Sequence, residues 1–182
     1  MDILQKTDEF LFRFINIDLA NPLTDKLMPF ITERNNWYIF YVIIWLYLFF
    51  KGGTKGKVSA IMILLLILVS DQFSAFIIKD FFQRIRPCHV ISNVHLLIGC
   101  SDSYSFPSNH AVNNFAAATL FSYFYKNMKY VLFAGAFLVA ISRVFCGVHY
   151  PFGMLGGAVI GILFAMLFIY LWKKLNKKLK LI

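Results

Sequence analysis

Long apolar runs alternate with short polar segments along this chain. Five of the runs approach the ~20 residues that a helix needs to cross about 30 Å of hydrocarbon. The runs cover residues 37–50, 57–79, 108–125, 130–141 and 152–172. Only Asp71 interrupts the second run, and Tyr170 and Trp172 at the end of the fifth are expected to anchor that helix at the membrane interface. The pattern predicts an all-α, polytopic membrane bundle of five to six helices.

The first 34 residues follow a different pattern. Phe10, Phe12 and Phe14 mix with charged residues, which is typical of an amphipathic segment lying in the membrane interface. A turn is expected at Asn21-Pro22, and a shallow sixth membrane helix is the alternative interpretation. A cleavable signal peptide is not expected, because acidic residues occupy its positive region. The predicted organisation is an interfacial segment over 1–34, a transmembrane bundle over 35–172 and a basic cytoplasmic tail over 173–182.

Composition narrows the class of protein. Of 182 residues, 59% are hydrophobic and 15% are charged, and the mean hydropathy is +0.67. A soluble enzyme is disfavoured, because soluble domains are ~45–50% apolar. The net charge of +9 comes from charges between apolar runs, so a membrane rather than a nucleic acid is the expected partner.

The lysines predict an orientation, because cytoplasmic loops carry an excess of basic residues. Three lysine groups fall on one side of a five-helix bundle: positions 51–57, positions 126–129 and the C-terminal tail. The opposite face then carries residues 79–110 and 143–152, including all four histidines. The unusual residues are therefore expected on the extracytoplasmic side.

Three cations lie at that face, although the positive-inside rule leaves it poor in basic residues. They are Lys79, Arg86 and Arg143. The planar fork of an arginine suits phosphate oxygens. Ser108 follows Pro107 as the expected N-cap of the third helix, where free backbone N–H groups make an anion site. Taken singly, each cation has the simpler interpretation of reaching lipid headgroups, and Pro-Ser that of ordinary capping.

Two histidines accompany these cations. His110 and His149 can titrate near neutral pH and suit the roles of nucleophile and general acid. A single histidine at a helix end is more often an ordinary polar contact. The joint occurrence favours chemistry on a phosphate group of a membrane molecule.

The order of these residues resembles a known family. The spacings Lys-x6-Arg-Pro, Pro-Ser-x-His and Ser-Arg-x5-His, over residues 79–153, resemble the type 2 phosphatidic acid phosphatases. These lipid phosphatases share their site with vanadium haloperoxidases. The resemblance implies that His149 attacks phosphorus to form a phosphohistidine and that His110 protonates the leaving oxygen. It further implies no metal and no cofactor. The residues implied to hold the phosphate oxygens are Lys79, Arg86, Ser108, Asn109 and Arg143.

Two positions depart from the family pattern. Asn109 replaces a glycine, a tolerable change because Asn adopts left-handed backbone more readily than most residues. Gly153 replaces the aspartate that orients the nucleophile, and losing the comparable aspartate of a Ser–His–Asp triad costs ~10⁴ in turnover. Asp102 is a candidate substitute but is expected to be solvated. Asp71 is expected to lie too deep and to make a polar contact inside the bundle.

Cysteines and small residues carry weaker signals. Cys88 and Cys100 bracket the outer loop and are candidates for a disulfide, leaving Cys146 as an odd thiol. A zinc site with His89 and His95 is the alternative, but the spacing matches no standard zinc pattern. Glycines recur at 153, 156, 157 and 161, where small residues allow close helix packing.

The sequence thus predicts a lipid phosphatase in a bacterial inner membrane, with its site on the periplasmic face. Lipid A 1-phosphate, undecaprenyl diphosphate, phosphatidylglycerol phosphate and phosphatidic acid are the substrates implied by the resemblance, which is strongest to bacterial lipid A 1-phosphatases and undecaprenyl-diphosphate phosphatases. Gly153 leaves three options open: an enzyme of reduced activity, a deliberate inactivation, or a catalytically impaired protein that binds lipid phosphates. A transporter is disfavoured, because the charges cluster at one interface.

Overall fold

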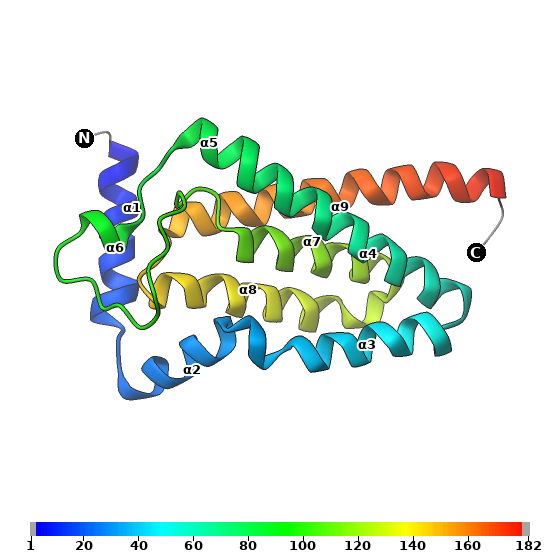
Figure 1. Cartoon of the computed structure of the whole chain (residues 1–182), viewed down its shortest axis with the longest axis horizontal. Helices are drawn as coiled ribbons and strands as arrows, with labels where there is room; N and C mark the ends of the chain where they lie inside the picture. The colour runs from blue at the N-terminus through cyan, green and yellow to red at the C-terminus, as the bar shows by residue number, and fades with distance from the viewer. Residues whose placement is uncertain (1–2, 180–182) are drawn as a thin grey trace.

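The fold is a bundle of membrane helices, and the computed structural model of the chain describes residues 3–179. Five long helices coincide with the five predicted runs (Figure 1). They are α3 (Tyr38–Lys51), α4 (Gly53–Phe73), α7 (Asn109–Phe124), α8 (Lys129–Phe145) and α9 (Pro151–Leu179). Three stretches are long and apolar enough to cross a membrane, namely Gly53–Val90, Lys126–Phe145 and Pro151–Lys178. The chain is therefore an integral membrane protein, as predicted.

Helix α7 lies at the centre of the bundle, packed against α4, α8 and α9. Its closest approach is to α9, at the predicted small residues. A Cβ atom on Gly161 would lie 2.1 Å from the carbonyl oxygen of Val112, and one on Gly157 would lie 2.7 Å from that of Ser108. Only glycine allows this spacing, which brings the starts of α7 and α9 together at one end of the bundle.

The prediction for Trp172 was wrong. Instead of sitting at the interface, its side chain is buried in a core cluster with Leu66, Leu120 and Ala165. Helix α9 continues for two further turns to Leu179, so position 172 is not the helix end and faces α7. Tyr170 is half exposed on the outer surface of the helix, with Lys174 over its ring.

The N-terminal segment forms two short helices that cover the same end of the bundle. Helix α1 (Ile3–Arg13) runs into a π-helical turn, η1 (Phe14–Asp18), and α2 (Pro22–Thr32) packs against α8. The expected turn at Asn21 is the start of α2, where the Asn21 side chain accepts hydrogen bonds from two backbone N–H groups. The α1 carboxylate of Asp8 is fully buried, pairs with Arg84 and accepts a hydrogen bond from the N–H group of Phe152.

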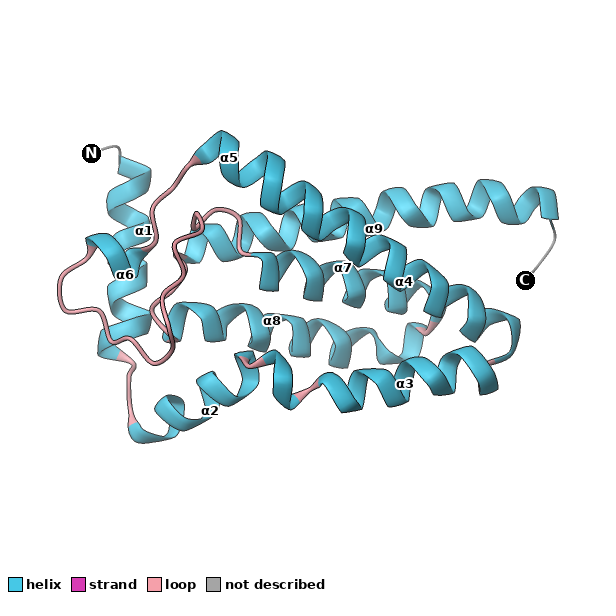
Figure 2. Ribbon diagram, in the orientation of Figure 1, coloured by secondary structure: helices cyan, strands magenta, loops and turns pink. Residues whose placement is uncertain are grey.

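The connection between α4 and α7 supplies most of the loop structure at this end (Figure 2). It contains a π-helical turn and two short helices before an extended loop. These elements are η3 (Ser74–Ile78), α5 (Lys79–Phe82) and α6 (Pro87–Val90). Cys88 and Cys100, which the sequence left open as a disulfide or as ligands of a zinc site, form a disulfide.

Candidate functional site

The three motif segments, residues 79–87, 105–110 and 142–153, lie at one end of the bundle, where the loop leads into α7 (Figure 1). Three side chains there are nearly inaccessible: Lys79 is 7% exposed, Arg86 5% and His149 2%. Burying cations costs free energy unless an anion or hydrogen-bond acceptors compensate. Two buried cations from one segment and a histidine from another therefore form a site suited to an anionic group.

Arg86 is held by the loop that precedes α7. Its Nε donates to the Ser103 carbonyl at 2.7 Å and its Nη2 to the Ser103 hydroxyl at 2.8 Å. Its Nη1 donates to the Val148 carbonyl at 3.1 Å and contacts Nε2 of His149 at 3.2 Å. Each of the three guanidinium nitrogens therefore has a hydrogen-bond partner that fixes the orientation of the side chain. Sequence reasoning missed Ser103, although the serines spaced along residues 101–105 offered a signal.

The two ring nitrogens of His149 have different partners, and together these partners define the tautomer. Nδ1 lies 2.7 Å from the carbonyl oxygen of Ser105, which can only accept, so Nδ1 carries the proton. Nε2 faces Arg86, which can only donate, so Nε2 presents its lone pair. Both contacts require the same neutral imidazole.

The first turn of α7 adds unpaired polar atoms. Ser108 is the N-cap residue, as predicted, but its side chain makes no capping hydrogen bond. Its buried hydroxyl has no partner within the described residues, and the same holds for Nε of Arg143 at the end of α8. Buried polar groups without partners are rare in native proteins. Both atoms are donors that an anion bound at this end of the bundle could use.

Thr32, at the end of α2, connects His110 with Arg143. Its hydroxyl accepts a hydrogen bond from Nη1 of Arg143 at 2.9 Å, and its backbone lies within hydrogen-bonding reach of His110. Thr32 is buried, 4% exposed. No sequence signal pointed to it, because its partners lie more than 70 residues away along the chain.

The Asn109 side chain points away from this cluster. Its Nδ2 donates to Oδ1 of Asp71 at 2.9 Å, and Asn113 donates to the same oxygen at 2.8 Å. The prediction that Asp71 makes a polar contact inside the bundle is confirmed. Any contact of Asn109 with phosphate would therefore come from its backbone.

The other candidate carboxylate is not near His149. Asp102 is fully solvated and lies 3.9 Å from the exposed His89. Gly153, in the first turn of α9, instead faces the loop directly: a Cβ atom there would lie 3.3 Å from the Ser105 carbonyl oxygen. The position of the expected aspartate thus adjoins the oxygen that accepts the His149 proton.

Comparison with known proteins agrees with this geometry. Residues 60–177 match the model of the PAP2 superfamily. The chain belongs to this superfamily. It is 29% identical to a lipid A 4'-phosphatase of Porphyromonas gingivalis, over 90% of this chain and 72% of the relative. It is 28% identical to an undecaprenyl-diphosphatase of Sulfolobus acidocaldarius, over 83% of this chain and 71% of the relative.

A solved structure shows the same fold. The PAP2-type phosphatidylglycerolphosphate phosphatase of Bacillus subtilis superposes with a TM-score of 0.77 at 26% identity. The match covers 96% of this chain and 88% of the other. The chain is accordingly a PAP2 lipid phosphatase by family and by fold.

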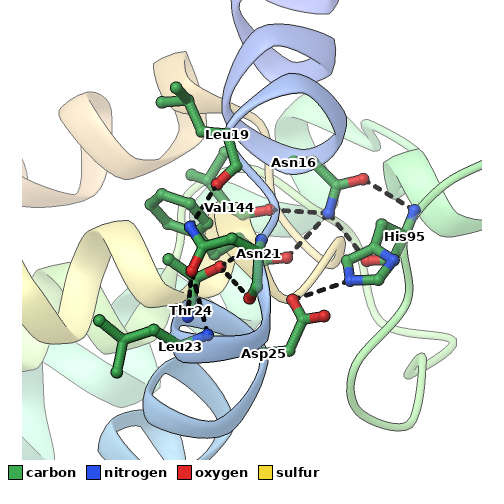
Figure 3. A network of polar contacts seen from close by, with 9 residues as sticks. Asn16, Leu19, Asn21, Leu23, Thr24, Asp25, His95 and Val144 are labelled. Atoms are coloured by element: carbon green, nitrogen blue, oxygen red, sulfur yellow. Dashed lines mark hydrogen bonds and ion pairs between the residues drawn. The ribbon is translucent and has the colours of Figure 1, made fainter.

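In this PAP2 chain, a buried amide fastens the N-terminal segment to the site (Figure 3). Asn16, in the π-helical turn, donates to the carbonyls of His95 and Phe145, both at 2.8 Å, and accepts from the His95 N–H group at 2.9 Å. The His95 ring in turn contacts Asp25 of α2 at 2.9 Å. One side chain therefore joins η1, the outer loop and the end of α8, just before the turn that carries His149.

The electrostatic environment of this PAP2 site keeps His149 uncharged. Complete burial lowers the pKa of His149 well below its ordinary value, and the charges of Arg86, Arg143 and Lys79 lower that pKa further. The neutral imidazole is the form that can act as a nucleophile.

Proposed function

We propose that this chain is an active phosphatase that removes a phosphate from a phosphate or diphosphate monoester of an envelope lipid, through a phosphohistidine on His149. The supporting observation is the pair of contacts at the His149 ring. With Nδ1 donating to the Ser105 carbonyl, Nε2 keeps its lone pair and faces the cations. A nucleophile needs an unprotonated atom, and these contacts leave Nε2 unprotonated on the side of the ring that faces Arg86.

The remaining residues suit the binding of the phosphate oxygens. Lys79, Arg86 and Arg143 supply positive charge, which stabilises the charge that develops on these oxygens during transfer. The Ser108 hydroxyl and Nε of Arg143 are donors without partners in the described structure. The backbone N–H groups at Asn109, in the first turn of α7, add the anion site of a helix N-terminus.

The reaction has two steps. Nε2 of His149 forms a bond to phosphorus while the bond from phosphorus to the lipid oxygen breaks, and protonated His110 gives that oxygen its proton. His110, now neutral, takes a proton from water as the water oxygen attacks phosphorus. The N–P bond breaks, phosphate leaves, and both histidines return to their starting forms. One histidine is thus nucleophile and leaving group, and the other is acid and then base.

The substrate class follows from the relatives and the membrane setting. Relatives are named for lipid A, undecaprenyl diphosphate and phosphatidylglycerolphosphate. We propose that the chain acts on one of these lipids or on phosphatidic acid. We further propose that it resides in a bacterial inner membrane with the site on the periplasmic face, opposite the lysine groups.

The test is phosphate release by the purified chain in detergent, measured on these four lipids. We expect release from at least one, and its loss in His149→Ala and in His110→Ala. His89→Ala is the matched control, because His89 is an exposed histidine of the same face outside the cluster. Protein incubated with substrate radiolabelled in the transferred phosphate and quenched in alkaline denaturant, where an N–P bond survives, should carry label in the wild type but not in His149→Ala.

Two results would contradict the proposal. Full turnover in His149→Ala would exclude the covalent route. No release from any of the four lipids, together with retained binding of the same lipids, would favour the alternative of a catalytically impaired lipid-phosphate binding protein.

A further inference from the structure

The group that accepts the Nδ1 proton of His149 is itself firmly held. It is the carbonyl of Ser105, a fully buried residue. The Ser105 N–H group donates to the Arg84 carbonyl at 2.6 Å, and Arg86 binds Ser103 two residues earlier through two hydrogen bonds. The segment that carries the acceptor is thus tied on one side to the chain between α5 and α6.

Gly153 fixes the same segment from the other side. Its carbonyl accepts a hydrogen bond from the N–H group of Ser108 at 3.0 Å. The absence of a side chain lets the first turn of α9 approach the loop, because a Cβ atom at 153 would already lie 3.3 Å from the Ser105 oxygen. A side chain at this position would require the Ser105 carbonyl or α9 to shift by a few tenths of an ångström, so glycine lets the carbonyl keep its present place without that shift.

We propose that the backbone carbonyl of Ser105 is the positioning group for His149 in this chain, in place of the carboxylate that the family pattern has at position 153. The inference rests on the proposed function, in which His149 is the nucleophile. Under this proposal Gly153 does not leave His149 without an acceptor. The acceptor for Nδ1 comes from the backbone of the loop before α7 instead of from a side chain of α9.

The exchange has an electrostatic consequence, because a carbonyl carries no net charge. His149 faces Lys79 of α5, Arg86 before α6 and Arg143 of α8, and these groups lower its pKa along with burial. A carboxylate at 153 would oppose these cations and raise that pKa. A lower pKa leaves Nε2 unprotonated to lower pH, so the chain should keep its activity at more acidic pH than a variant with the aspartate.

The direct test is the tautomer of His149 in the full-length protein, labelled with ¹⁵N-histidine and measured by long-range ¹H–¹⁵N NMR correlation. His149→Gln assigns the signal. We expect a single neutral form with the proton on Nδ1. A proton on Nε2, or an average of the two forms, would overturn the proposal. The measurement needs no substrate, so inactivity towards every lipid would refute the proposed function while leaving this readout intact.

Variants at 153 provide the second test. Gly153→Asp is compared with Gly153→Ala, which adds the same Cβ atom without a carboxylate. Restoring a missing orienting group would raise kcat/KM by up to ~10⁴-fold, whereas we expect Gly153→Asp to stay within about tenfold of wild type. In the pH profile of kcat/KM, we expect the acid limb of Gly153→Asp to lie at higher pH than the acid limb of Gly153→Ala. A gain of about 10²-fold or more over wild type, or identical acid limbs in the two folded variants, would overturn the proposal. If thermal melting shows that neither variant folds, the wild-type tautomer alone decides.

Discussion

The glycine contact between α7 and α9 allows a quantitative prediction for Gly161→Ala. The added Cβ would lie 2.1 Å from the Val112 carbonyl oxygen and 3.0 Å from the Ala116 nitrogen, whereas ordinary contact begins at 3.4 Å. Both neighbours are backbone atoms and cannot rotate away. In a close-packed interior the two helices must therefore separate locally by about 1.3 Å.

Two effects of that separation can be estimated. Overpacking of this kind costs ~1–3 kcal/mol in the free energy of unfolding, partly offset by the higher helix propensity of alanine, worth up to ~1 kcal/mol. The same shift moves Ser108 and His110, which begin α7, relative to His149, which precedes α9. A misplacement of about 1 Å in a catalytic site can cost ~10²-fold in rate. We expect losses in both stability and turnover.

The assay is unfolding in detergent, paired with phosphate release at saturating lipid. Gly135→Ala in α8 is the matched control, because a Cβ atom there meets no atom within 4 Å. We expect this control to unfold at or slightly above the wild-type midpoint and to keep its turnover. If Gly161→Ala behaves like Gly135→Ala in both measurements, the glycine contact does not set the spacing of the two helices.

Three further predictions concern contacts around the site. Asn16→Ala removes the partner of three part-buried backbone groups of His95 and Phe145, so the free energy of unfolding should fall by ~1–3 kcal/mol, while the exposed Asn127→Ala should leave it unchanged. Cys88→Ser opens a disulfide that spans 12 residues, which should lower chemical stability by ~3 kcal/mol; equal melting with and without reductant would contradict this. Asp71→Leu removes the acceptor of two part-buried amide groups, those of Asn109 and Asn113, and should lower stability more than Asp71→Asn does.

The main elements of the fold could be predicted from the sequence because the membrane imposes strict rules. A crossing helix must be long and apolar, so five of the helices appear as five runs. The candidate site residues could be picked out for another reason: each group occupies a short stretch at a helix end, and three helix ends lie at one face of the bundle. Cys88 and Cys100 also bracket a single loop, which made their pairing accessible to sequence reasoning.

The contacts that Thr32 and the Ser105 carbonyl make with the site residues are not marked by any comparable pattern in the sequence. Thr32 meets Arg143 only because α2 folds back against α8, a contact across 111 positions of sequence. The acceptor for His149 is a backbone carbonyl, and every residue has one, so no letter in the sequence marks Ser105. Trp172 was misassigned because the apolar run was expected to end there, whereas the lysine-rich segment continues the helix.

The two departures from the family pattern share a physical logic. Asn109 stands where the resemblance predicts a glycine, yet its side chain is directed to Asp71, so the side chain does not fill the proposed phosphate site. Gly153 stands where the resemblance predicts an aspartate, yet Nδ1 of His149 still meets an oxygen acceptor. What the chemistry needs is a donor or acceptor at a given point, and either backbone or side chain can supply it. A glycine at position 153 therefore argues against activity only in a chain where no backbone carbonyl accepts the hydrogen bond from Nδ1 of the histidine.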